Sequence, residues 1–67
     1  CIRDMNYISA LEVILKNHPS GVVRAHATWA LGEIASPKSR AILSKYLKLE
    51  ADQDVREEIF LAIESLD

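Results

Sequence analysis

Side chains capable of acid–base, nucleophilic or metal chemistry occur in this sequence, but their spacing does not combine them. His18 and His26 have no cysteine or carboxylate at the spacing of metal ligands. Glu57 and Glu58 are adjacent, so on a helix they diverge by about 100° and cannot act as an acid and base pair. No serine lies in a nucleophile-elbow motif. The sequence therefore predicts no catalytic residue, no cofactor-binding residue and no metal ligand in this chain.

Three side chains indicate a binding surface instead. His26, Trp29 and Glu33 are spaced by three and four residues, which places them on one stripe of a helix. Aromatic side chains and histidine stack on bases in RNA recognition, so this stripe is a candidate surface for RNA or for a protein partner. The alternative is structural. In that case Trp29 packs against a preceding unit of the fold, and His26 is a hydrogen-bonded interface histidine.

Basic side chains form two further groups. The first is a candidate phosphate-contacting patch on one predicted helix, and its members are Lys38, Arg40, Lys45 and Lys48. Contacts to a nucleic-acid backbone require only charge and reach, although a solvated helix face explains the same residues. The second group is the pair Arg24 and Arg56. We expect each guanidinium to meet a carboxylate or a helix-end carbonyl between repeats, with phosphate contact as the alternative.

The elements that position these residues come from an internal repeat. When the chain is laid over itself at an offset of 32 residues, the identical pairs include Leu11/Leu43, Leu15/Leu47, Lys16/Lys48, Val23/Val55, Arg24/Arg56 and Ala30/Ala62. A period of this length with matched apolar positions is typical of stacked helical hairpins. The chain therefore contains two copies of one unit.

Apolar residues recur at intervals of three and four within each copy, which predicts helices rather than strands. The predicted helices cover residues 5–17, 21–35, 37–49 and 53–66. Ser20 is a candidate N-cap for the second helix, and Ser36 for the third, where proline follows at the first helical position. Either Asp52 or Asp54 caps the fourth helix, and Asp54 with Glu57 has the spacing of a capping box.

These elements predict an all-α, helical-hairpin solenoid of two repeats and four antiparallel helices, because short connections make neighbouring helices antiparallel. Residues 1–67 form one domain, with repeat 1 at about 5–35 and repeat 2 at about 37–66. A free-standing solenoid usually needs at least three repeats, and this chain begins with Cys-Ile-Arg instead of Met. We therefore expect it to be the C-terminal fragment of a longer protein.

The amino-acid composition limits the fold class and the cellular location expected for this domain. Of the 67 residues, 49% are apolar and only four are Gly or Pro, so we expect a folded helical chain. The single cysteine, Cys1, excludes an internal disulfide and favours a cytoplasmic location. No apolar run approaches the roughly 20 residues that span a bilayer, so no membrane contact is expected. A net charge of −2 predicts weak RNA binding by this segment alone.

The second predicted helix of each copy reads Val-Arg-x-x-Ala/Ile-x-x-Ala-Leu/Ile-x-x-Ile/Leu, a pattern that resembles the HEAT repeat. In the first copy, residues 18–32 read His-Pro-Ser-Gly-Val-Val-Arg-Ala-His-Ala-Thr-Trp-Ala-Leu-Gly. His26 and Trp29 within this run distinguish it from a generic HEAT repeat. The run is similar to the C-terminal HEAT-like domain of epoxyqueuosine reductases, which are iron–sulfur and cobalamin enzymes of tRNA queuosine synthesis.

The resemblance implies a parent that reduces epoxyqueuosine at the tRNA wobble position, with cobalamin and two 4Fe-4S clusters bound upstream. None of these cofactors is expected in this fragment, because it has one cysteine and a cluster usually needs four thiolates. The expected role is that of a non-catalytic accessory domain that helps to position tRNA or braces the catalytic domain of the parent chain. The alternative is a protein–protein interaction scaffold of a HEAT-repeat protein unrelated to tRNA.

Overall fold

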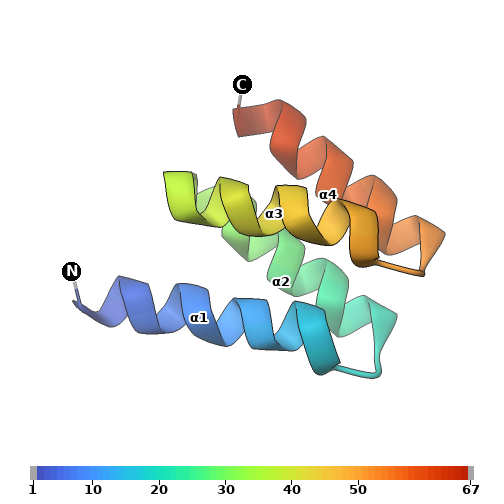
Figure 1. Cartoon of the computed structure of the whole chain (residues 1–67), viewed down its shortest axis with the longest axis horizontal. Helices are drawn as coiled ribbons and strands as arrows, with labels where there is room; N and C mark the ends of the chain where they lie inside the picture. The colour runs from blue at the N-terminus through green and yellow to red at the C-terminus, as the bar shows by residue number, and fades with distance from the viewer. Residues whose placement is uncertain (1, 67) are drawn as a thin grey trace.

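Four helices follow one another with short connections in the computed structural model, which describes residues 2–66 and the side chains of residues 7–66. Their bounds are α1 Ile2–Asn17, α2 Gly21–Ile34, α3 Pro37–Leu49 and α4 Gln53–Leu66. Helices α1 and α3 form one layer, and α2 and α4 form the layer behind it (Figure 1). The all-α hairpin solenoid predicted from the sequence is thus confirmed. Cys1 lies outside the described residues.

The hydrophobic core lies between these two layers and draws on all four helices. Its buried apolar residues are Ile8, Leu11, Leu15, Ala27, Leu31, Ile42, Leu43, Tyr46, Val55 and Ile59. Several of these residues are pairs at the repeat offset, such as Leu11 with Leu43 and Ala27 with Ile59. Because α2 packs against both α1 and α4, it is the central element of the stack. The two repeats therefore share one core.

The helix starts are fixed by side-chain caps. The backbone N–H of Val23 donates to the Ser20 hydroxyl at 3.4 Å. Ser36 caps α3 as predicted, and it does so in a capping box with Ser39 that was not predicted. For α4 the capping box of Asp54 and Glu57 was wrong. The carboxylate of Asp52 accepts from the backbone N–H of Asp54 at 2.8 Å, so Asp54 itself lies within the first turn of the helix.

A stripe of small residues on α2 allows close approach to α4. These residues are Gly21, Ala25, Thr28 and Gly32, and their spacing of four, three and four residues places them on one face. A Cβ added to Gly32 would lie 3.3 Å from the Cβ of Ala62, closer than ordinary van der Waals contact. Thr28 is fully buried, with its hydroxyl donating to the Arg24 carbonyl at 3.0 Å. We call these four residues the small-residue stripe.

Helix α2 ends at Ile34 because Ala35 adopts the left-handed conformation, with φ 54° and ψ 33°. Its N–H donates to the Leu31 carbonyl at 3.2 Å, which closes the helix. Glycine is the residue that adopts this conformation without steric cost. We therefore expect Ala35→Gly to raise the free energy of unfolding by about 0.5–1 kcal/mol.

Urea denaturation of the purified chain measures this change. The matched control is Ala41→Gly, at an exposed position inside α3. There glycine should lower stability by about 1 kcal/mol, because the helix interior penalises its backbone freedom. An equal loss of stability in both variants would contradict the left-handed helix-ending conformation assigned to Ala35.

Candidate partner-binding surface

The α2–α4 face carries two adjoining hollows, and Trp29 and Glu58 line both of them. The larger has a volume of about 700 Å³ and is lined by residues that include His26 from α2 together with Asp54 and Glu57 from α4. The smaller also includes Glu33 and Leu61. We call the two together the α2–α4 groove. The stripe of His26, Trp29 and Glu33 expected from the sequence therefore lines one continuous surface.

Trp29 is 65% exposed. The second repeat contains the equivalent position with a repeat before it, so the two exposures can be compared. Its counterpart at the repeat offset is Leu61, which is 50% exposed although a repeat precedes it. Leu61 lines the smaller hollow together with Trp29, Gly32 and Glu33 of the preceding repeat. By the same geometry, a repeat placed before α1 would border Trp29 and leave it partly exposed, while its other side lines the groove toward α4.

The groove has a strongly acidic lining. The larger hollow includes the carboxylates of Asp52, Asp54, Glu57 and Glu58, and the smaller adds that of Glu33. Among the described residues that line the two hollows, none is Lys or Arg. The sequence pattern predicted Glu33 at this surface but not Asp54 and Glu57 of α4. The available signal was the run of acidic residues from Glu50 to Glu58, which the helical hairpin brings beside Trp29.

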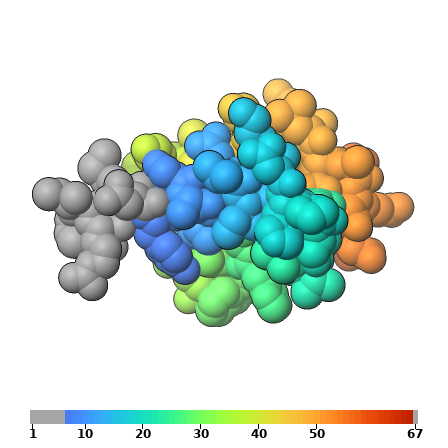
Figure 2. Space-filling model, turned by 90° about the horizontal axis from the view of Figure 1, so that it is seen from below, coloured from blue at the N-terminus to red at the C-terminus, as the bar shows by residue number. Residues whose placement is uncertain are grey.

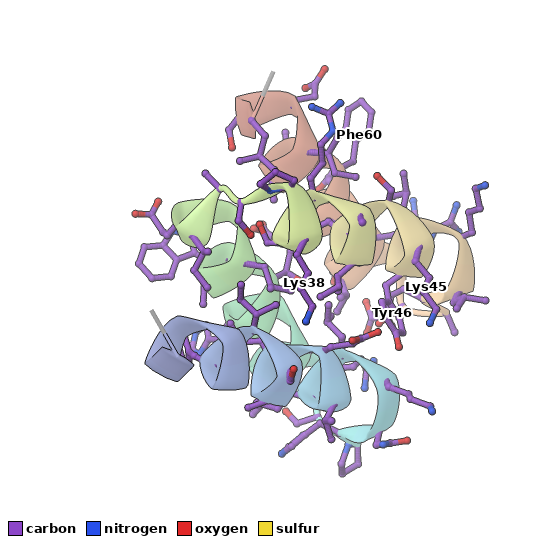
Figure 3. The ribbon with its side chains drawn as sticks, turned by 60° about the vertical axis from the view of Figure 1, so that its left-hand side comes forward. Lys38, Lys45, Tyr46 and Phe60 are labelled. Carbon is purple, nitrogen blue, oxygen red and sulfur yellow. The ribbon has the colours of Figure 1, made fainter. Side chains whose placement is uncertain are left out.

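The basic residues of α3 are all exposed, but they do not form one stripe. At about 100° per residue, Lys38 and Lys45 lie roughly 20° apart, whereas Arg40 is roughly 160° from Lys38. Lys38 and Lys45 extend on the side of α3 that faces α1, and Phe60 lies on the opposite side (Figure 3). The Lys45 ammonium lies 3.7 Å from the Glu12 carboxylate and 5.3 Å from the centre of the Tyr46 ring. Lys45 is thus partly neutralised.

Lys48 is also exposed, close to the C-terminal end of α3. Arg40 is exposed and takes part in an interaction with another group of the chain. Exposed cations available for a phosphate are therefore spread around the helix rather than concentrated. Figure 2 shows the face on the α1 side of the molecule, with the residues of α1 and the α1–α2 connection at the front.

Arg24 joins the two repeats. Its Nε and Nη2 atoms donate to the two carboxylate oxygens of Glu50, each at 3.0 Å, and its Nη1 donates to the His18 carbonyl at 2.6 Å. The side chains of Arg24 and Glu50 are only 17% and 5% exposed. Bidentate pairs of this kind have both strength and fixed geometry. Arg24 therefore acts as a clamp between the connection before α2 and the connection before α4.

His18 and Glu50 occupy the same position in the two repeats and perform the same local task. The Nδ1 atom of His18 accepts from the backbone N–H of Ser20 at 3.0 Å, and a carboxylate oxygen of Glu50 accepts from that of Asp52 at 3.0 Å. Each side chain therefore orders the residue that caps the next helix. Arg56, the repeat counterpart of Arg24, is exposed at the end of the stack and lines a hollow with Leu47, Gln53 and Phe60.

Within the described part of the chain, no three His, Cys, Asp or Glu side chains come together as a metal site. In that same part, no helix combines the length and the apolar character needed to cross a bilayer. The arrangement instead provides contact surfaces: a clamped two-layer stack, an acidic groove with one exposed tryptophan, and scattered cations on α3.

Stacked helical hairpins with a shared core and an exposed inner-helix groove define an α-solenoid repeat protein. The family model for HEAT repeats matches residues 2–67, and the chain belongs to this family. Among characterised proteins, it is similar to the epoxyqueuosine reductase of Bacillus subtilis (strain 168), with 33% identity over 64 residues. The alignment covers 96% of this chain but 17% of that protein, so the chain spans about a sixth of its relative's length. No solved structure matches the chain significantly.

Proposed function

We propose that this chain is a non-catalytic accessory repeat domain of an epoxyqueuosine reductase, in which it braces the catalytic part and helps to position tRNA. The observation that carries the proposal is the 33% identity with the Bacillus subtilis reductase over nearly the whole chain. HEAT repeats are quasi-linear stacks whose exposed faces serve as binding surfaces, which agrees with an accessory role. The reaction itself would belong to the remaining five-sixths of such an enzyme.

The residues of this chain do not fit the cofactors of such a reductase. The chain has a single cysteine, whereas a 4Fe-4S cluster is held by four thiolates. The described residues also contain no cluster of metal-ligating side chains. Cobalamin and the two 4Fe-4S clusters would therefore be held elsewhere in the parent, and no step of the reaction is assigned to this domain.

The exposed surface of α3 is the part of the chain best suited to tRNA. Lys38 and Lys48 are exposed there, and ammonium groups on flexible stems suit contacts to phosphate oxygens. The α2–α4 groove is unsuited to phosphates because carboxylates line it. We expect these two lysines to add modestly to tRNA affinity, since each phosphate contact is worth one counterion released into solution.

The test uses the complete reductase with the double substitution Lys38→Gln and Lys48→Gln. We expect tRNA affinity to fall by roughly three- to tenfold at low salt, and the slope of log affinity against log salt to shrink by about 1–2. The matched control is Lys16→Gln, an exposed lysine on α1, which should leave both quantities unchanged. A reductase that lacks this domain yet keeps its full activity and tRNA affinity would contradict the accessory role.

The second candidate function is a protein-binding scaffold in a HEAT protein unrelated to tRNA. The acidic, tryptophan-containing groove favours this candidate, because its lining repels nucleic acid. The sequence of the parent gene separates the two functions. Two cysteine-rich cluster motifs upstream support the reductase, and further HEAT repeats in their place support the scaffold.

A further inference from the structure

From the geometry of the α2–α4 groove we infer that it docks an arginine-bearing, partly apolar segment supplied by the catalytic part of the same polypeptide. This inference rests on the proposed function for the source of the segment, but not for its chemistry. The chemistry comes from the groove alone: one exposed aromatic ring, an apolar rim and several carboxylates.

The aromatic ring is that of Trp29, which lines both hollows of the groove. Glu58 of α4 also lines both, and Glu33 lies one helical turn beyond Trp29 on the same face of α2. A guanidinium group stacks on an indole face while its edge donates two hydrogen bonds to a carboxylate. A tryptophan with carboxylates beside it is therefore suited to arginine. The ammonium group of lysine lacks both the planar face that stacks on the indole and the fixed pair of N–H donors that matches a carboxylate.

The apolar rim indicates that the occupant is more than a single charged side chain. Val22 is 68% exposed on α2, one helical turn from His26 and two from Trp29, and Leu61 is 50% exposed on α4. Val22 lines the larger hollow and Leu61 the smaller, and exposed apolar residues along one groove are typical of a surface covered by a partner. A segment with apolar residues flanking arginine would cover this rim and satisfy the carboxylates at the same time.

The negative charge of the groove excludes nucleic acid, the main competing occupant. The groove combines the carboxylates of Asp52, Asp54, Glu57, Glu58 and Glu33, and no Lys or Arg among the described residues lines it. A phosphate backbone placed there would meet like charge without a compensating cation. A protein segment tethered in the same polypeptide also has a high effective concentration, which permits docking through a surface of this modest size.

The chemistry is tested on the 67-residue chain with the probe acetyl-Leu-Arg-Ala-Leu-Arg-Leu-amide. Trp29 is the only tryptophan, so its fluorescence reports directly on occupation of the groove. We expect saturable binding, at least tenfold weaker for the same peptide with citrulline, which is isosteric with arginine but uncharged. The substitutions Glu33→Gln and Glu58→Gln together should also weaken binding at least tenfold. The control Glu64→Gln, on α4 but outside both hollows, should not change it.

Three results would overturn the chemistry: no binding at millimolar peptide, equal binding of the arginine and citrulline peptides, or tighter binding of a 12-residue oligouridylate than of the peptide. The source is tested with the reductase lacking this domain, added in trans. We expect it to bind the 67-residue chain and to lose at least tenfold affinity with the Glu33→Gln, Glu58→Gln variant. If the peptide binds and the truncated reductase does not, the proposed source is wrong. If neither binds while the tRNA effect of Lys38 and Lys48 persists, the docking inference fails and the proposed function stands.

Discussion

Replacing Leu31 with aspartate is expected to unfold the chain. Leu31 is fully buried in α2, the helix that packs against α1, α3 and α4. A domain of this size has roughly 3–10 kcal/mol of total stability. An unpaired carboxylate in a buried apolar site costs several kcal/mol, and the lost leucine contacts add about 2–5 kcal/mol more. The sum of these two costs exceeds the free energy of unfolding expected for the whole domain.

Circular dichroism at 222 nm and thermal melting measure this outcome. The matched control is Leu61→Asp, the same exchange at a half-exposed position in α4. We expect that variant to remain folded, with a loss within about 1 kcal/mol, because its side chain reaches solvent. A cooperative melt of the Leu31→Asp variant near the wild-type temperature would show that α2 is not central to the core.

The second large effect is expected at the clamp between the repeats. Glu50→Ala removes the two carboxylate oxygens that accept from Arg24, leaving it only the His18 carbonyl, and also removes the acceptor for the Asp52 N–H. Breaking a largely buried ion pair by removing one partner costs about 3 kcal/mol, since the remaining charge stays desolvated. We therefore expect a loss of about this size in urea denaturation, with the Glu64→Ala control at an exposed position within about 0.5 kcal/mol.

A double-mutant cycle separates the clamp from the individual side chains. Arg24→Ala should cost less in the Glu50→Ala background than in the wild type, with a coupling energy of about 1–3 kcal/mol. Additive effects of the two substitutions would instead mean that the contact between the repeats contributes nothing beyond local capping. Salt should weaken the coupling only slightly, because the pair is mostly shielded from solvent.

Local features were predictable from the sequence because they depend on residues within one helical turn. The predicted helices agree with the structure within three residues at every end, and Ser20 and Ser36 cap as expected. The error at α4 has a local cause as well. Two aspartates were available, and Asp52 is the one preceded by Glu50, whose carboxylate accepts from its N–H and holds it outside the helix.

Contacts between the repeats were less predictable because they depend on how far the second hairpin is displaced along the stack. The sequence indicated an acceptor for Arg24 but not that Glu50, 26 residues away, provides it. It also indicated the stripe of Trp29 but not Asp54 and Glu57, which α4 adds to the same groove. The exposure of Trp29 could be interpreted only by comparison with Leu61, since internal repetition supplies a copy of the same position with its neighbour present.

The small-residue stripe also bears on self-association. Two copies stacked end to end would repeat the contact between α2 and α4 without closing, the geometry that produces open filaments. The counterparts of Gly21, Ala25, Thr28 and Gly32 on α4 are Gln53, Glu57, Phe60 and Glu64. These larger and charged side chains prevent the close approach that the stripe allows.

The contact between Arg24 and Glu50 also has no equivalent in such an end-to-end polymer. In a second copy placed after α4, the position equivalent to Glu50 is occupied by His18. Arg56 would then face an imidazole that already accepts from the Ser20 N–H, instead of a carboxylate. The two halves of the duplicated unit have thus diverged at the positions that would let one copy extend another, so we expect the chain not to polymerise end to end.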